Sequence, residues 1–320
     1  MTTIPITVVA KNEARALARC LESLSQACEH ATAELGLAFD RLVVADDCRD
    51  DTVGIARSCG WPVVTSTGGK VSAQLRGVRP GPFVLFSDAD LRVEPDTVTA
   101  LCEAMLRDPS LQVAMPPKVP VPPRRRTVLA HALHLYNLRR GHSSQRTWFS
   151  GKLFAIRRYE MPSVRQMKAR AEALPDDRFY DYAAGMRIDD IYLSRVIVRD
   201  HGLGSIVETS RGQIWFRAPE TFVGMYRYYR RMRMELERLD RLFPETRAVH
   251  RRHGRRRPDL LASAPARERM AWQVFEFALR LCKVLYFVER HYYQRISRRP
   301  CDPWPVVEET KEPPWTVHPR

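Results

Sequence analysis

The first 115 residues alternate between two apolar patterns, and this alternation restricts the fold more than any other feature of the chain. Short runs rich in β-branched and aromatic residues predict buried strands, and apolar residues at helical spacing between them predict helices. The strand-like runs lie at residues 6–10, 42–45, 62–65, 83–86 and 111–115. Strands that alternate with helices in this way indicate an α/β fold with a mostly parallel sheet flanked by helices.

Acidic residues follow two of these strands. Ala10 closes the first run, Asp46 the second, and Asp88 and Asp90 follow the fourth. Ligands of doubly wound sheets bind beyond the carboxyl ends of the strands, so we expect these ends to meet in one crevice. Asp88 and Asp90 point the same way from an extended backbone, where a divalent cation carrying phosphates would offset their repulsion. The alternative for each acid is a cap on the following helix.

Size and charge narrow the class of partner. The chain has 320 residues and a formal net charge of +15, and its length suffices for one large domain with an appendage. The positive charge indicates an anionic partner, either a nucleotide, a nucleic acid or an acidic membrane surface. Seven cysteines without a Cys-x-x-Cys pair argue against a disulfide framework or a zinc site and suit a reducing cytoplasm.

We expect a cytoplasmic protein that is soluble or bound peripherally to the inner face of the membrane. The sequence has no basic leader and no run approaching the roughly 20 apolar residues that cross a bilayer. A long helical pattern at residues 270–296 is predicted to pack on the main domain. Alternatively it lies in a membrane interface, supported by the basic run at residues 251–257. The tail from residue 301, rich in Pro and Glu, is expected to be extended.

Two further clusters of charge lie in the second half of the chain. Asp189 and Asp190 begin a helical pattern, a place where acidic residues usually interact with the helix dipole. A cationic stripe is formed by Arg227, Arg230, Arg231 and Arg233, which by default is a solvated helix face and otherwise suits phosphate oxygens. The residues alone leave both alternatives open.

Several motifs occur in the order found in one known family. They are the turn at residues 8–13, the strand end at 44–52, the helix at 69–77, the Asp-x-Asp at 87–90, the strand at 151–157, the acidic pair at 189–193 and the basic helix at 227–231. Over roughly its first two-thirds the chain therefore resembles the family 2 glycosyltransferases. It departs from the family at Asp189, where Glu is usual, and at Arg231, where Trp is expected to stack on an acceptor sugar.

The resemblance implies a fold and a division of the chain. The expected fold is GT-A, the Rossmann-like fold of nucleotide-diphospho-sugar transferases, with a helical C-terminal extension. Residues 1–216 would form the catalytic domain, with a nucleotide-sugar half at about 1–117 and an acceptor half at about 118–216. Residues 217–320 would form a basic helical extension and tail.

The resemblance also implies an activity and a site. The expected reaction is inverting transfer of a sugar from a UDP- or GDP-sugar to a hydroxyl of a lipid or saccharide, with Mg²⁺ or Mn²⁺ as cofactor. It assigns Asp190 and Asp189 to catalysis; Ala10, Glu13, Asp46, Lys70, Asp88, Arg227, Arg230 and Arg231 to the donor nucleotide; Asp88 and Asp90 to the metal; and Trp148 and Gly151 to the acceptor. The basic, aromatic C-terminal region favours a hydrophobic acceptor and an anionic membrane surface as a partner.

Two other classes of protein are alternatives. A sugar-nucleotide nucleotidyltransferase shares the sheet and the metal chemistry, but it usually carries a Gly-rich basic loop where this chain has residues 10–13. A basic protein that binds nucleic acid or a membrane surface without catalysis would account for the net charge. That class leaves the acidic strand ends unexplained, so no specific nucleic acid is expected as a partner.

Overall fold

A seven-stranded sheet forms the centre of the molecule, as a computed structural model shows for residues 2–140, 148–175, 179–180, 182, 185–253, 265–297, 301 and 307–311. Its strands are β1 (Thr3–Ala10), β2 (Ala38–Asp46), β3 (Val63–Ser66), β4 (Val84–Asp88), β6 (Val113–Met115), β8 (Leu153–Ile156) and β9 (Ile206–Glu208). They lie in the order β3-β2-β1-β4-β8-β6-β9. Only β8 runs antiparallel to its neighbours among these strands, so the predicted mostly parallel α/β sheet is confirmed.

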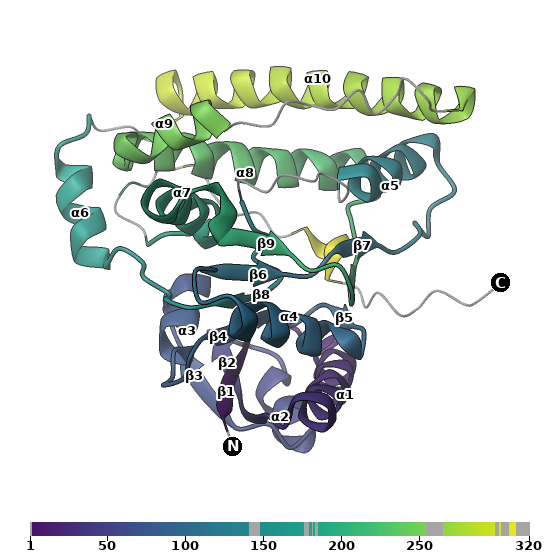
Figure 1. Cartoon of the computed structure of the whole chain (residues 1–320). Helices are drawn as coiled ribbons and strands as arrows, with labels where there is room; N and C mark the ends of the chain where they lie inside the picture. Colours follow the sequence, from purple (N-terminus) through teal and green to yellow (C-terminus); the bar gives the residue numbers. More distant parts are fainter. Residues whose placement is uncertain are drawn as a thin grey trace.

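Helices cover both faces of the sheet (Figure 1). They are α1 (Leu17–Leu35), α2 (Thr52–Ser58), α3 (Lys70–Gly77), α4 (Asp96–Arg107), α5 (Val128–Arg140), α6 (Val164–Glu172), α7 (Asp189–His201), α8 (Phe222–Leu242), α9 (Pro244–His253) and α10 (Ala266–Arg295). Helices α1, α2 and α4 share a core with one face, and α3 and α7 pack on the other.

The register of the inner strands sets where their ends lie. On β1, Ile6 and Val8 face the α1 side, while Thr7 faces α3 and donates a hydrogen bond to the carbonyl of Gly77 at 2.8 Å. Val9 lies opposite both Val44 of β2 and Asp88 of β4. The carboxyl ends of β1, β2 and β4 therefore meet at one edge of the sheet.

A second, three-stranded sheet lies beside this edge. Its strands are β5 (Arg92–Val93), β10 (Ile214–Phe216) and β7 (Lys118–Pro120), in the order β5-β10-β7. Strand β5 follows the acidic turn after β4 directly, and its pairing with β10 joins that turn to the chain just before the C-terminal helices. All described strands lie before residue 217, and α8, α9 and α10 follow them.

The C-terminal helices stack outside α7, with α10 along one edge of the molecule (Figure 1). Helix α10 buries a row of side chains against α5 and α8, namely Ala271, Phe275, Ala278, Cys282 and Tyr286. The rings of Phe275 and Tyr136 stack at 4.0 Å between centroids. The predicted long helix and its packing on the main domain are confirmed. Of the helices in the described ranges, none is long and apolar enough to cross a membrane.

Two details differ from the sequence expectation, and one lies outside the described residues. Apolar spacing predicts a helix over residues 13–28, but α1 begins only at Leu17, because a turn with Asn12 at φ 53° precedes it. The tail is not uniformly extended, since Glu308–Thr310 form a short 3-10 helix. In the basic run at 251–257, residues 254–257 and the side chains of 251–253 lie outside the described part.

Candidate active site

Asp46 lies buried at the end of β2 and organises the turn before α3. Its Oδ1 accepts hydrogen bonds from Ser66 Oγ at 2.8 Å and from the backbone N–H of Gly69 at 3.2 Å. Lys11 Nζ, from the turn after β1, lies 3.5 Å from Oδ2. The carboxylate is therefore held by three neighbouring segments at the edge of the sheet, and Ala10, itself buried, ends β1 beside it.

Asp88 and Asp90 form the acidic centre of the crevice at the end of β4. Lys70 Nζ lies 2.8 Å from Asp88, and Lys152 Nζ lies 3.9 Å from Asp88 and 3.8 Å from Asp90. Burial raises the pKa of Asp90, and the neighbouring Asp88 raises this pKa further, whereas Lys152 lowers it. The two lysines thus offset charge that the protein gathers in a partly desolvated place.

The pair at the start of α7 divides into one buried and one half-buried carboxylate. Asp189 is 2% exposed and accepts a hydrogen bond from Gln74 Nε2 at 2.9 Å. Burial raises the pKa of Asp189 to about 6. Asp190 is half-buried and accepts hydrogen bonds from the backbone N–H of Gly151 at 3.1 Å and of Ile191 at 3.0 Å. Of the two carboxylates, only that of Asp190 is partly exposed.

Lys70 joins the acids of β4 to those of α7. Its ammonium contacts Asp88 and donates a hydrogen bond to the carbonyl of Gly151 at 2.9 Å. Burial lowers the pKa of Lys70, but the carboxylates of Asp88, Asp189 and Asp190 outweigh it and raise that pKa above its ordinary value. A continuous path of contacts therefore runs from Asp88 through Lys70 and Gly151 to Asp190.

Glu13 and Arg231 of α8 add further charge near Asp88 and Asp90. Burial raises the pKa of Glu13 to about 7, Asp90 adds to the rise, and Lys311 opposes it. Arg231 lies close enough to Asp88 and Asp90 for their charges to raise its pKa, although burial outweighs them and lowers it. The guanidinium of Arg231 lies 5.5 Å from the ring centre of Tyr228. Residue 231 is the position at which the family resemblance predicts Trp.

The structure does not bring the whole cationic stripe to the crevice. Arg230 is buried against α10, where its Nε lies 2.9 Å from the carboxylate of Glu289. The expected role of Arg230 on the diphosphate therefore loses its geometric basis, because α8 is covered by α10 on that side. Arg227 is exposed, one turn before Arg231. Trp148 is half-buried three residues before Gly151.

The residues of the crevice fit a divalent cation that arrives with a diphosphate. Asp90 Oδ1 is buried without a hydrogen-bond partner, and Lys152 Nζ lies 3.8 Å from it, so a cation would share this oxygen with the lysine. Within the described ranges, no group of three or more His, Cys, Asp and Glu side chains is arranged to hold a metal by itself. A pair of carboxylates that shares the ion with substrate phosphates is the usual arrangement for Mg²⁺.

Sequence reasoning missed several residues of this crevice. Lys152, which contacts Asp88 and Asp90, belongs to the motif at residues 151–157, and that motif assigns it no role of its own. Gln74 lies one helical turn after Lys70, and this i,i+4 spacing could have placed it on the same face. Tyr159 donates a hydrogen bond to Gln74 Oε1 at 2.6 Å and so fixes the amide that contacts Asp189. No pattern in the sequence pointed to Lys311.

Comparison with known proteins gives one family and a set of similar folds. Residues 6–161 match the model of Glycosyl transferase family 2, and no curated protein matches the chain. Among solved structures, glucosyl-3-phosphoglycerate synthase from Mycobacterium tuberculosis is similar in its complex with Mn²⁺, UDP and glucosyl-3-phosphoglycerate, at 19% identity over 75% of this chain and 80% of that chain, with a TM-score of 0.47. Its complex with Mg²⁺ and UDP gives 21% identity over 75% and 79%, with a TM-score of 0.46.

Proteins with an α/β sheet of this kind form a class that binds ligands beyond the carboxyl ends of the strands, which is where the acids of this chain lie. Within this class, residues 6–161 belong to glycosyl transferase family 2. The protein is accordingly a glycosyltransferase, and the matched segment contains β2 and β4, which end in Asp46 and Asp88.

Proposed function

We propose that the protein is an inverting, metal-dependent glycosyltransferase that moves a sugar from a UDP- or GDP-sugar to an acceptor hydroxyl. The observation that carries the proposal is the path of contacts from Asp190 through Gly151 and Lys70 to Asp88. A carboxylate suited to act as a base lies at one end of this path, and the acids suited to the donor diphosphate lie at the other. A sugar attached to that diphosphate would lie between them.

The donor binds along the edge formed by β1, β2 and β4. Asp46 and the turn containing Glu13 face the nucleoside, and Asp88 lies near the ribose or the metal. Asp90, together with Asp88, would hold Mg²⁺ or Mn²⁺, and the cation would offset the charge of the diphosphate and of the leaving nucleotide. Three further cations would bind the phosphate oxygens, namely Arg231, Lys70 and Lys152. Their proximity to Asp88 or Asp90 supports this role.

Asp190 acts as the base in the transfer step. The acceptor oxygen forms a bond to the anomeric carbon, the bond from that carbon to the phosphate oxygen breaks, and the hydroxyl proton passes to Asp190. The nucleoside diphosphate leaves with the bonding electrons, and the anomeric configuration inverts because attack and departure occur on opposite faces. Asp189 is unsuited to this role, since it is 2% exposed and bound to Gln74.

A screen of UDP- and GDP-sugars tests the proposal. We expect one of them to raise the Tm of the protein and to be hydrolysed slowly, in both cases only with Mg²⁺ or Mn²⁺ present. Proton NMR of the transfer product then reports the anomeric configuration, and an α-linked donor should give a β-glycoside. A product that keeps the donor's configuration would overturn the inverting mechanism, and metal-independent transfer would overturn the role of the cation.

The acceptor is proposed to be a lipid or another hydrophobic molecule at an anionic membrane surface. Helix α10 exposes a row of apolar side chains at helical spacing, with exposed fractions from 40% to 70%, namely Met270, Phe277, Leu281, Val284, Val288 and Tyr292. Arg269, Arg280 and Lys283 are exposed beside this row. An apolar helix face with basic residues along its side is the pattern of helices that lie in the interface of an anionic bilayer, and the net charge of +15 agrees with it.

A further inference from the structure

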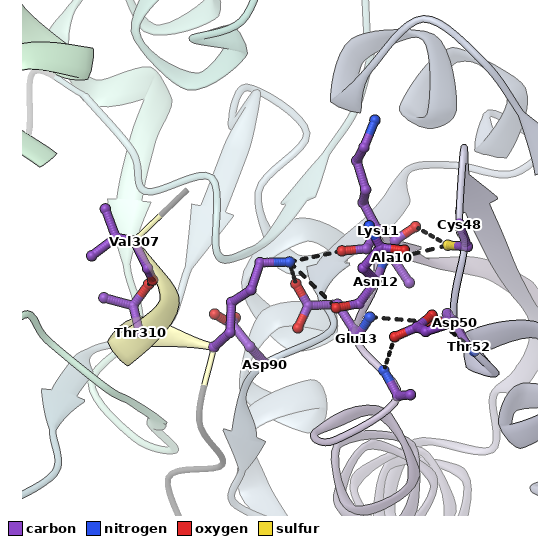
Figure 2. Close-up of polar contacts among 12 residues, drawn as sticks. Ala10, Lys11, Asn12, Glu13, Cys48, Asp50, Thr52, Asp90, Val307 and Thr310 are labelled. Carbon is purple, nitrogen blue, oxygen red and sulfur yellow. Dashed lines mark hydrogen bonds and ion pairs between the residues drawn. The ribbon is translucent and has the colours of Figure 1, made fainter. Parts of the chain in front are cut away.

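The segment Val307–Lys311, which we name the C-terminal clasp, reaches back to the turn after β1 (Figure 2). Lys311 Nζ donates hydrogen bonds to the carbonyl of Lys11 at 2.8 Å and to Glu13 Oε1 at 2.9 Å, and it lies 3.4 Å from the carbonyl of Asn12. The two charged side chains are only 28% and 13% exposed. Partial burial makes such a charged pair stronger than an ion pair on the open surface.

The clasp has an anchor of its own on α8. Val307 is 3% exposed, and Glu309 Oε1 accepts hydrogen bonds from the backbone N–H of Glu220 at 3.1 Å and from Thr221 Oγ1 at 3.1 Å. A carboxylate at the start of a helix satisfies N–H groups that lack partners within the helix and is favoured by the helix dipole. A Cβ at Gly224 would collide with Glu309, so the glycine leaves room for the carboxylate.

The turn after β1 is held from its other side by the loop after β2. Asp50 Oδ2 accepts a hydrogen bond from the N–H of Ala14 at 3.0 Å, and Thr52 Oγ1 accepts one from the N–H of Glu13 at 2.9 Å (Figure 2). Lys311 binds the carbonyl groups of the same turn. The N–H groups are therefore fixed by the β2 loop and the carbonyl groups by the clasp.

We propose that Lys311 is a positioning residue for the donor site and that the clasp ties the turn after β1 to the start of α8. This inference rests on the proposed function, because the turn carries Glu13, a residue proposed to face the donor nucleoside. The ammonium of Lys311 offsets the negative charge that Glu13 adds beside Asp90, and it fixes the direction of the Glu13 carboxylate. Helix α8 carries Arg231, so the clasp connects the nucleoside side of the crevice to its diphosphate side.

Lys311→Met tests the clasp without any substrate. In ligand-free protein, amide hydrogen exchange of the peptide covering residues 10–16 should become faster in Lys311→Met and in Glu309→Gln, which loosens the anchor on α8. Lys311→Arg keeps the charge and should stay near the wild type, and Lys168→Met, which removes an exposed lysine of α6, should leave this peptide unchanged. Unchanged exchange in both Lys311→Met and Glu309→Gln would overturn the clasp.

Kinetics with the donor found by the screen test the positioning role. We expect Lys311→Met to raise the KM for the nucleotide sugar about tenfold, the loss of roughly one charged hydrogen bond, with kcat within about threefold and the acceptor KM unchanged. A purely structural tail would lower the Tm and leave the donor KM unaltered, and that result would overturn the role. If the wild type binds no nucleotide sugar, the proposed function fails, while the exchange data still decide whether the clasp exists.

Discussion

The backbone N–H of Gly151 donates a hydrogen bond to Asp190 at 3.1 Å, while its carbonyl accepts one from Lys70 at 2.9 Å. A Cβ built on Gly151 would lie 3.3 Å from both Asp190 Cβ and Lys70 Nζ. A Cβ at residue 151 would therefore require Asp190 or Lys70 to shift by a few tenths of an ångström. Through Gly151 the proposed base is connected to Lys70 and so to Asp88 of β4.

Gly151→Ala should therefore damage catalysis more than folding. The added methyl group displaces Asp190 or Lys70 by a few tenths of an ångström, and we expect kcat to fall about 10-fold to 100-fold. Gly204→Ala is the matched control, because a Cβ there meets no atom within 4 Å. Kinetics and thermal unfolding of both variants measure the effect. Equal kcat values in the two variants would contradict the importance of this contact.

Asp190→Asn should abolish transfer while donor binding persists. The amide cannot accept the acceptor proton, so kcat should fall about 10²-fold to 10⁴-fold, while the donor affinity measured by titration calorimetry stays within a few-fold of the wild type. Asp200→Asn, in the last turn of the same helix, removes an exposed carboxylate paired with Arg199 and serves as the control. Normal turnover by Asp190→Asn would remove this residue from the role of base.

Asp189 predicts a change of stability with pH. Burial raises the pKa of Asp189 to about 6 from its ordinary 3.8, so the folded state binds this proton more tightly than the unfolded chain does. The corresponding stability is fully present below about pH 4 and is lost as the pH rises through about 6. Asp189→Asn has no such proton to lose. The free energy of unfolding of Asp189→Asn minus that of the wild type should therefore increase by about 1–3 kcal/mol between pH 4 and pH 7.

Urea unfolding of both proteins across that pH range measures the difference. The experiment is done without nucleotide, so that ligand binding does not contribute to the free energy of unfolding. A difference that stays constant with pH would show that Asp189 titrates alike in the folded and unfolded states.

The arginines of α8 should separate into binding and structural residues. Arg231→Met should raise the donor KM about tenfold or more, because a cation near Asp88 and Asp90 is lost from the diphosphate. Arg230→Met should instead lower the free energy of unfolding by about 1–3 kcal/mol, because Glu289 of α10 is left without its ion pair. Arg233→Met, an exposed neighbour, is the control for the KM. An unchanged donor KM in Arg231→Met would contradict its proposed role.

Helix α10 should bind vesicles that contain anionic lipid. We expect the wild type to float with phosphatidylglycerol vesicles, less so in high salt, and to stay in solution with neutral phosphatidylcholine. Phe277→Asp and Val284→Asp, at positions 70% and 58% exposed, should each weaken binding about tenfold, whereas Val164→Asp on α6, at a position 55% exposed, should not. Equal flotation of all variants would exclude α10 as the membrane-binding face.

The sequence predicted the elements that depend on local pattern. Strand runs, the helices between them and the acids after β2 and β4 were all read from spacing within a few residues, and the edge position of Asp46 and Asp88 followed from the rule that parallel strands end together. The direction of β8 was less accessible, because periodicity does not distinguish antiparallel from parallel pairing.

The side of a helix that meets a partner was also beyond the sequence. Arg230 and Arg231 are adjacent on α8, yet one faces Glu289 and the other lies near Asp88. Helix α8 packs on one side against elements that precede residue 217 and on the other side against α10. A stripe of like residues does not tell which layer will contact it.

The chain by itself determined the order of its strands and helices and the positions of its acidic strand ends, since these depend on interactions between near neighbours. The tertiary structure alone decided which charges meet across long separations. Lys152 reaches Asp90 from the residue before the antiparallel strand β8, and Lys311 reaches Glu13 from 298 residues away. Such pairs form because the packing of several layers brings their segments together, and no local pattern in either segment encodes that arrangement.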